Sequence, residues 1–229
     1  MKNIVIIGAS RGIGKALVTL LSESHQVLAI SRNQEKLISL KTELKKQHVY
    51  IARIDISKDT AKDEISAAVK QHFNSVDILI NNAGVLVNSP ILDLKTSDMH
   101  HVLNTNIIGL IQACQAIIPF MSNEGHIVNI GSMGGYQGSA KFSGLSIYSA
   151  SKAAVANFTE CLAEELKKTN IKTNCLALGA AQTEMLTEAF PGYEAPVSAE
   201  KMAEYIADFS LTAHQWLNGK IIPLALSTP

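Results

Sequence analysis

The sequence lacks the features that mark several large classes of protein. It has only three cysteines, an odd number without CxxC spacing, so neither a disulfide framework nor a thiolate metal site is expected. Because Cys114, Cys161 and Cys175 have apolar neighbours, we expect buried, reduced thiols. Basic and acidic side chains balance at 20 each, with no basic run, which disfavours nucleic acid and anionic membranes as partners.

Long apolar runs are also absent. Apolar stretches end after a handful of residues, short of the roughly 20 needed to cross a bilayer, so no membrane span is expected. The strand-like run Ile4–Ile7 starts too close to Met1 for a signal peptide, so we expect a cytoplasmic protein. Neighbouring residues point about 100° apart on a helix, so His100 and His101 cannot bind one ion from one face, and no metal is expected.

What the sequence does contain is a regular alternation of short apolar runs and helical segments. Seven β-branched runs are compatible with buried strands: Ile4–Ile7, Val27–Ile30, Tyr50–Ile54, Val76–Ile80, His126–Ile130, Lys172–Leu176 and Lys220–Leu224. The alternation predicts a three-layer, doubly wound α/β Rossmann fold, with a seven-stranded parallel sheet and helices on both faces. The length of 229 residues predicts a single domain over residues 1–229.

Two later segments stand out. Ser146–Lys167 is predicted to form one long helix, with Tyr148 and Lys152 four residues apart on the same face. Residues 183–200 are rich in Pro, Gly and acidic residues with little periodicity, which predicts a loop or flap.

A glycine-rich turn follows the first predicted strand. Gly8, Gly12 and Gly14 lie between that strand and an amphipathic helix, where glycine permits close approach of a ligand and the free amides of the helix attract a pyrophosphate. The turn therefore predicts a phosphate-bearing ligand. A P-loop is excluded, because Ala9 stands where its first glycine is needed and Lys15 is not followed by Ser or Thr.

Two of the three arginines in the chain favour one dinucleotide. An acidic residue at the end of the second strand would bind the ribose 2′-hydroxyl of NAD and repel the 2′-phosphate of NADP. Arg32 ends that strand instead, and Arg11 lies in the glycine turn. Since the guanidinium fork suits phosphate, we predict NADP(H), with NAD(H) as the alternative. Asp55 could accept a hydrogen bond from adenine, or cap a helix expected near Ser57.

Four residues are candidates for chemistry. A neighbouring ammonium and a positive nicotinamide ring would lower the pKa of the Tyr148 phenol from about 10, which makes it a usable acid or base. Ser132 follows a predicted strand and could bind a substrate oxygen, or only stabilise a turn. Asn106 lies on an apolar helical face, where it could hold a water shared with Lys152 or hydrogen-bond to nearby backbone.

Taken together, these residues resemble the short-chain dehydrogenase/reductase family from Met1 to about Thr183. Residues 8–14 look like its TGxxxGxG element, residues 81–84 like NNAG, and Gly179 with Thr183 like PGxxxT. Asn106, Ser132, Tyr148 and Lys152 match the family's catalytic tetrad. The expected cofactor-binding residues are Gly8, Ser10, Arg11, Gly12, Ile13, Gly14, Arg32, Asp55, Ile56, Asn82, Ala83, Gly84, Tyr148, Lys152, Gly179 and Thr183.

The resemblance implies an oxidoreductase that moves a hydride between NADP(H) and the CH–OH or C=O group of a small-molecule alcohol or ketone. Tyr148 would protonate the carbonyl oxygen that Ser132 holds. Lys152 would bind the ribose and lower the pKa of the phenol, and Asn106 would anchor a water that passes protons to Lys152. Thr183 would bond the nicotinamide carboxamide. The alternative is a non-catalytic, dinucleotide-binding regulatory protein with the same fold.

The sequence also departs from the family pattern. Leu178 replaces a proline before Gly179, and the glycine-containing segment from Ser132 to Tyr148 is about three residues longer than usual. The ending Ile221–Pro229 lacks the usual Asp-Gly-Gly, which puts the tetramer contact through the last strand in doubt. A homodimer or homotetramer is expected, and four small residues on the long helix favour a dimer through it: Ala150, Ala153, Ala154 and Ala156.

Overall fold

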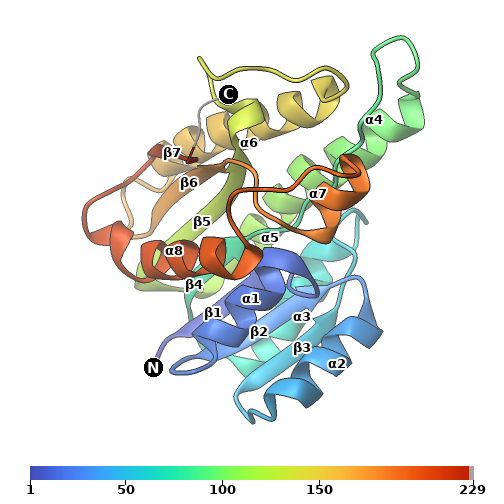
Figure 1. The fold of residues 1–229 in the computed structure, drawn as a ribbon. Coiled ribbons are helices and arrows are strands. Elements are labelled where there is room, and N and C mark those ends of the chain that lie inside the picture. The colour runs from blue at the N-terminus through green and yellow to red at the C-terminus, as the bar shows by residue number, and fades with distance from the viewer. Residues whose placement is uncertain (227–229) are drawn as a thin grey trace.

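The computed structural model describes residues 1–226, in which seven strands form one parallel sheet between two layers of helices (Figure 1). The strands are β1 (Asn3–Ile7), β2 (Gln26–Ser31), β3 (Val49–Arg53), β4 (Val76–Asn81), β5 (Met121–Ser132), β6 (Lys172–Leu178) and β7 (Ile221–Leu224). Their order is β3-β2-β1-β4-β5-β6-β7, and every pair is parallel. The predicted doubly wound fold is therefore confirmed. The order reverses between β1 and β4, the place where such sheets bind ligands beyond their carboxyl ends.

Eight α-helices lie within the described residues. They are α1 (Gly12–Leu21), α2 (Gln34–Leu44), α3 (Ala61–His72), α4 (Thr96–Leu103), α5 (Gly109–Ile117), α6 (Ser146–Glu165), α7 (Glu184–Ala189) and α8 (Ala199–Thr212). A π-helical turn, η1 (Asn104–Ile108), joins α4 to α5. Helices α1, α2 and α8 pack on one face of the sheet, and α3, α5 and α6 on the other.

Burial on both faces explains why the strands appear in the sequence as continuous apolar runs. Ile4, Val5 and Ile6 are consecutive in β1 and all are fully buried, although neighbouring side chains point to opposite faces. Leu17 of α1 packs in the cluster on one side, and Val155 of α6 in the cluster on the other. Each such side chain contributes about 1.5–3 kcal/mol through removal from water.

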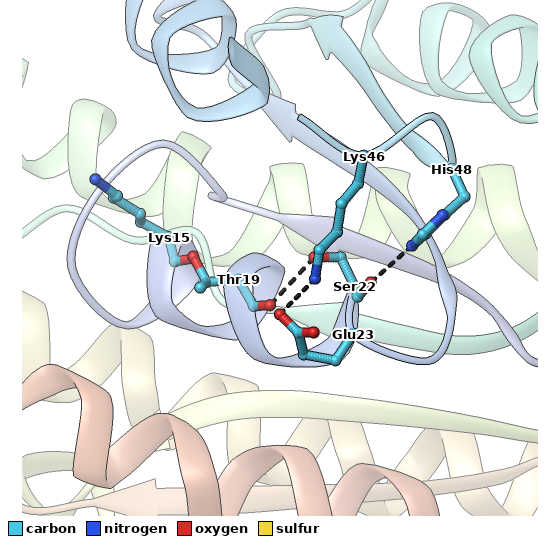
Figure 2. A network of polar contacts seen from close by, with 6 residues as sticks. All are labelled: Lys15, Thr19, Ser22, Glu23, Lys46 and His48. Carbon is cyan, nitrogen blue, oxygen red and sulfur yellow. Dashed lines mark hydrogen bonds and ion pairs between the residues drawn. The ribbon is translucent and has the colours of Figure 1, made fainter. Parts of the chain in front are cut away.

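Contacts between two loops stabilise the sheet at the amino-terminal ends of β2 and β3 (Figure 2). His48 Nε2 donates to the carbonyl oxygen of Ser22 over 2.7 Å, and Lys46 forms an ion pair with Glu23. The loop after α1 is thereby tied to the loop before β3. These contacts lie at the amino-terminal ends of the strands. They therefore stabilise the sheet at the end opposite to the one where ligands bind.

Residues 183–200 differ from the predicted loop, because α7 forms within them. The hydroxyl of Thr183 accepts from the Leu186 amide over 3.3 Å and caps α7, while Ser198 caps α8. A helix of six residues is too short to show a clear periodicity.

Two further expectations need correction. The helix expected near Ser57 begins at Ala61, after a turn in which the carboxylate of Asp55 accepts from the amide and hydroxyl of Ser57. Cys161 is exposed, contrary to the expectation of a buried thiol, because it lies on the outer face of α6; Cys114 and Cys175 are buried as expected. The terminal segment Ile221–Pro229, which lacks the Asp-Gly-Gly of the family, lies outside the described residues at positions 227–229.

One helical stretch, Thr96–Phe120, is long and apolar enough to cross a membrane by length and composition alone. We did not expect such a stretch from the sequence, because Asn104, Thr105 and Asn106 interrupt the apolar residues. Of its most apolar window, 56% is buried inside the protein, and Leu110 packs in the core on the α3 side of the sheet. In this fold the stretch serves as a core helix.

Candidate active site

A cleft of about 840 Å³ opens at the carboxyl ends of the strands. Its walls come from the glycine turn, the ends of β2 to β6, the start of α6 and the region of α7. Every predicted cofactor-binding residue except Gly14 lines this cleft, together with Ser132, Tyr148 and Lys152 of the predicted tetrad. Asn106 does not line it and lies buried in η1.

The glycine turn is fixed by close packing. Gly8 has φ +85°, and a Cβ there would lie 2.5 Å from the Cα of Ala83. Gly14 lies beneath the turn, where a Cβ would lie 2.0 Å from the carbonyl oxygen of Gly8. Asn82 Nδ2 donates to that same oxygen over 2.9 Å. Positions 8 and 14 therefore need glycine for reasons of packing as well as ligand approach.

The start of α1 is suited to an anion. Its N-cap residue, Arg11, makes no capping hydrogen bond with its side chain, and the first turn contains no acidic residue. The first amides of a helix have no intrahelical partner, so they are free to bind phosphate oxygens. The donor set and the volume of the cleft thus fit a dinucleotide.

Charges of both signs line this end of the cleft. The cations are Arg11, Arg32 and Lys36, and the carboxylates are Asp55, which follows β3, with Glu184 and Glu188 of α7. Burial alone would raise the pKa of Asp55, but hydrogen bonds from Ser57 hold it below its usual value. Asp55 is therefore an ionised acceptor at neutral pH.

Tyr148 and Lys152 lie one turn apart on α6, as predicted. Lys152 Nζ is 5.9 Å from the centre of the Tyr148 ring and donates to the carbonyl oxygen of Ile130 over 2.8 Å. Burial lowers the pKa of Lys152 to about 8. Burial also raises the pKa of Tyr148, against the effect of a hydrogen bond with Ser132. The expected lowering of the phenol pKa is thus not present in the protein alone, because removal from water disfavours the phenolate.

Ser132 ends β5 and has two contacts. Its hydroxyl accepts from the amide of Gly134 over 3.2 Å, and it lies close enough to the phenol of Tyr148 to lower the pKa of that group. The two interpretations offered by the sequence are therefore compatible, since one hydroxyl both stabilises the turn and faces the candidate proton donor.

Asn106 hydrogen-bonds to nearby backbone, which was one of the two alternatives. Its Oδ1 accepts from the amide of Val85 over 2.8 Å, and its Nδ2 donates to the carbonyl oxygen of Val85 over 3.0 Å and to Ser151 Oγ over 2.9 Å. Only 1% of the residue is exposed. The side chain therefore positions the loop that follows β4.

Sequence reasoning missed much of the rest of the cleft wall. Apolar side chains from three loops and α7 line it: Leu86, Phe142, Leu145, Met185, Leu186, Phe190 and Tyr193. Thr105 also lines it, and its buried hydroxyl has no partner among the described residues. The available signal was the concentration of apolar and aromatic residues in the otherwise aperiodic segment 183–200.

Comparisons with known proteins agree with this geometry. A sequence profile described as short chain dehydrogenase matches residues 2–194. An uncharacterized oxidoreductase of Staphylococcus aureus strain USA300 is 32% identical over 217 residues, which are 93% of this chain and 92% of that protein. Carbonyl reductase family member 4 of Danio rerio is 37% identical over 183 residues, 79% of this chain and 76% of that protein. A short chain dehydrogenase from Burkholderia cenocepacia, crystallised in complex with NADP, superposes with a TM-score of 0.85 at 25% identity, covering 97% of this chain and 95% of that chain.

Proposed function

Because the chain belongs to the short-chain dehydrogenase/reductase family, we propose that it is an NADP(H)-dependent oxidoreductase of a small-molecule alcohol or ketone. The observation that carries the proposal is that Ser132, Tyr148 and Lys152 line the same cleft as the glycine turn. A surface tyrosine beside a surface lysine would have no such relation to a phosphate-binding turn.

The residues of the cleft divide the work of carbonyl reduction. When bound, reduced nicotinamide supplies a hydride to the carbonyl carbon, and the phenol of Tyr148 supplies a proton to the oxygen, so that C=O becomes CH–OH. In the reverse direction the phenolate takes the proton from the alcohol. Ser132, which lies beside the phenol, orients the substrate oxygen toward it.

Lys152 is suited to holding the cofactor ribose beside Tyr148. An ammonium has three donors, and the carbonyl oxygen of Ile130 takes one of them. Two donors remain for the ribose hydroxyls. Burial holds its pKa at about 8, so the group can gain or lose a proton near neutral pH. Its positive charge favours the phenolate.

We propose NADP(H) over NAD(H) because of the charges at the adenosine end. Arg11, Arg32 and Lys36 line that end, with Asp55 as a carboxylate at the end of β3 rather than β2. A guanidinium binds a phosphate through two parallel hydrogen bonds. The solved relative from Burkholderia cenocepacia is bound to NADP, which supports the same choice.

The other end of the cleft favours a neutral, apolar substrate. Apart from Lys152, the charged side chains that line the cleft belong to the adenosine end or to α7, where Glu184 and Glu188 lie beside the glycine turn. Much of the rest of the cleft wall is apolar or aromatic, and includes Met133, Phe142, Leu145, Met185, Phe190 and Tyr193. A carboxylate or phosphate on the substrate would be desolvated there without a partner.

We further propose a single-domain, cytoplasmic enzyme that forms a homodimer or homotetramer. Ala150, Ala153 and Ala154 are exposed along α6, and small side chains there would let a second copy approach closely.

The test is Tyr148→Phe, with Tyr136→Phe as the matched control because Tyr136 is half-buried in the segment before α6 and does not line the cleft. Oxidation of NADPH is followed with apolar ketones and aldehydes, β-keto thioesters and sugars, and NADPH binding is followed by fluorescence. We expect Tyr148→Phe to lower turnover at least about 100-fold with nearly unchanged binding, since a positioned acid contributes that much. Unchanged turnover would reject the role of Tyr148.

A further inference from the structure

An ion pair joins the two sides of the cofactor end of the cleft. Arg11 Nη1 donates to Glu188 Oε1 over 2.8 Å, and both side chains line the cleft. Arg11 comes from the glycine turn and Glu188 from α7, 177 residues later. The side chain of Arg11 is 34% exposed and that of Glu188 64% exposed, so the pair can be broken by a competing anion.

Helix α7 is placed so that it brings this carboxylate to the glycine turn. The Cγ2 atom of Thr183 lies 3.2 Å from the position that a Cβ on Gly12 would occupy. At the other end of the helix, Asn88 Nδ2 donates to the carbonyl oxygen of Ala189 over 3.0 Å. Both ends of α7 are thus attached, and the helix lies beyond the carboxyl ends of the central strands (Figure 1).

We propose that Glu188 determines cofactor specificity, because its carboxylate competes with the 2′-phosphate of NADP(H) for Arg11. The inference rests on the proposed cofactor function. Glu188 weakens the binding of NADP(H), so the protein prefers NADP(H) less strongly than Arg11 and Arg32 alone would make it.

The competition follows from charge. The 2′-phosphate must approach Arg11 while a carboxylate is bonded to it, and two anions that share one guanidinium repel each other. The 2′-hydroxyl of NAD(H) carries no charge and leaves the ion pair in place. Glu188 therefore weakens binding of the phosphorylated cofactor and leaves binding of NAD(H) nearly unchanged.

The experiment measures the Kd of NADPH and NADH by fluorescence titration, without substrate or turnover. It compares the wild type with Glu188→Gln, Arg11→Gln and the double variant. Glu194→Gln is the control, because Glu194 is an exposed carboxylate outside the cleft lining. Since exposed ion pairs are weak, we expect Glu188→Gln to tighten NADPH binding about two- to fivefold and to leave NADH unchanged. In the Arg11→Gln background the same change should have no effect.

The outcomes separate this inference from the proposed function. Equal tightening of both cofactors, no tightening of NADPH, or an effect that persists without Arg11 would overturn the role of Glu188 alone. A wild-type protein that binds neither cofactor would overturn the proposed function and this inference together. An effect of Glu194→Gln equal to that of Glu188→Gln would show that overall charge, and not the ion pair, sets the affinity.

Discussion

Asn106 and Val85 exchange two hydrogen bonds across the base of the cleft, one in each direction between side chain and backbone. Val85 directly follows the Asn-Asn-Ala-Gly residues at the end of β4, so the pair fastens that loop to the π-helical turn η1. A carboxamide can donate and accept at once, whereas a carboxylate or an ammonium cannot. Asparagine is therefore required here by the backbone that it faces.

Asn106→Ala should destabilise the protein by at least about 2 kcal/mol, because it leaves buried backbone groups of Val85 and the hydroxyl of Ser151 without this partner. Urea unfolding measures the change. Asn104→Ala is the matched control, since Asn104 lies in the same turn and its side chain has no hydrogen bond within residues 1–226. Equal stability of the two variants would contradict the positioning role.

Arg32→Asp should shift cofactor use toward NADH. Arg32 is exposed at the end of β2 and lines the cleft, so an acidic side chain there would repel the 2′-phosphate. We expect the ratio of kcat/KM for NADPH to that for NADH to fall about 10- to 100-fold, as a charge-assisted hydrogen bond is lost. Arg53→Asp is the control, because Arg53 is exposed but does not line the cleft. An unchanged ratio in Arg32→Asp would remove the proposed role.

Ser132→Ala should lower kcat about 100-fold, the typical effect of removing one donor to a reacting oxygen. Binding of NADPH should remain close to that of the wild type, since Ser132 faces Tyr148 and not the glycine turn. Single-turnover kinetics and cofactor titration separate the two effects. Ser143→Ala, an exposed serine in the same segment, should change neither quantity. A loss confined to cofactor affinity would show that Ser132 serves only the turn.

Much of the fold was predictable because the central strands are buried on both faces, and because each glycine of the turn either has a positive φ or has a neighbour too close for a side chain. Runs such as Ile4–Ile7 and the glycines at 8, 12 and 14 record these constraints directly in the sequence. The one-turn spacing of Tyr148 and Lys152 is likewise local, so their helix could be predicted from the residues alone.

What could not be predicted depends on contacts between distant segments. The sequence around Asn106 does not predict its hydrogen bonds with Val85, and the sequence around Arg11 does not predict its ion pair with Glu188. Helix α7 is too short for a periodic pattern, and the pKa of Tyr148 depends on burial that only the folded chain provides. Many residues of the cleft could therefore be predicted from the sequence, but the distant residues with which they form hydrogen bonds and ion pairs could not.

His126 provides a test of the packing between β5 and α8. The residue is fully buried, its Nδ1 donates to the carbonyl oxygen of Ser210 over 2.9 Å, and its Nε2 accepts from Asn174 Nδ2 over 3.1 Å. The bond from Asn174 requires the neutral ring, because a protonated Nε2 cannot accept. Burial lowers the pKa of His126 to about 4, with a smaller contribution from the nearby His214.

Stability should fall as the pH drops from about 6.5 to about 4. In that window the unfolded chain, with an ordinary histidine pKa, binds a proton that the folded His126 does not, so protonation favours unfolding. Above about pH 6.5 the ring is neutral in both states and the loss disappears. The difference in pKa corresponds to about 3 kcal/mol at the acid end of the window.

Urea unfolding from about pH 4 to pH 7 should therefore show a steeper loss of stability for the wild type than for His126→Gln, which has no ring to protonate. His101→Gln, an exposed histidine on α4, should follow the wild type. If His126→Gln loses stability as steeply as the wild type, the acid sensitivity arises elsewhere and the buried neutral ring is not its cause.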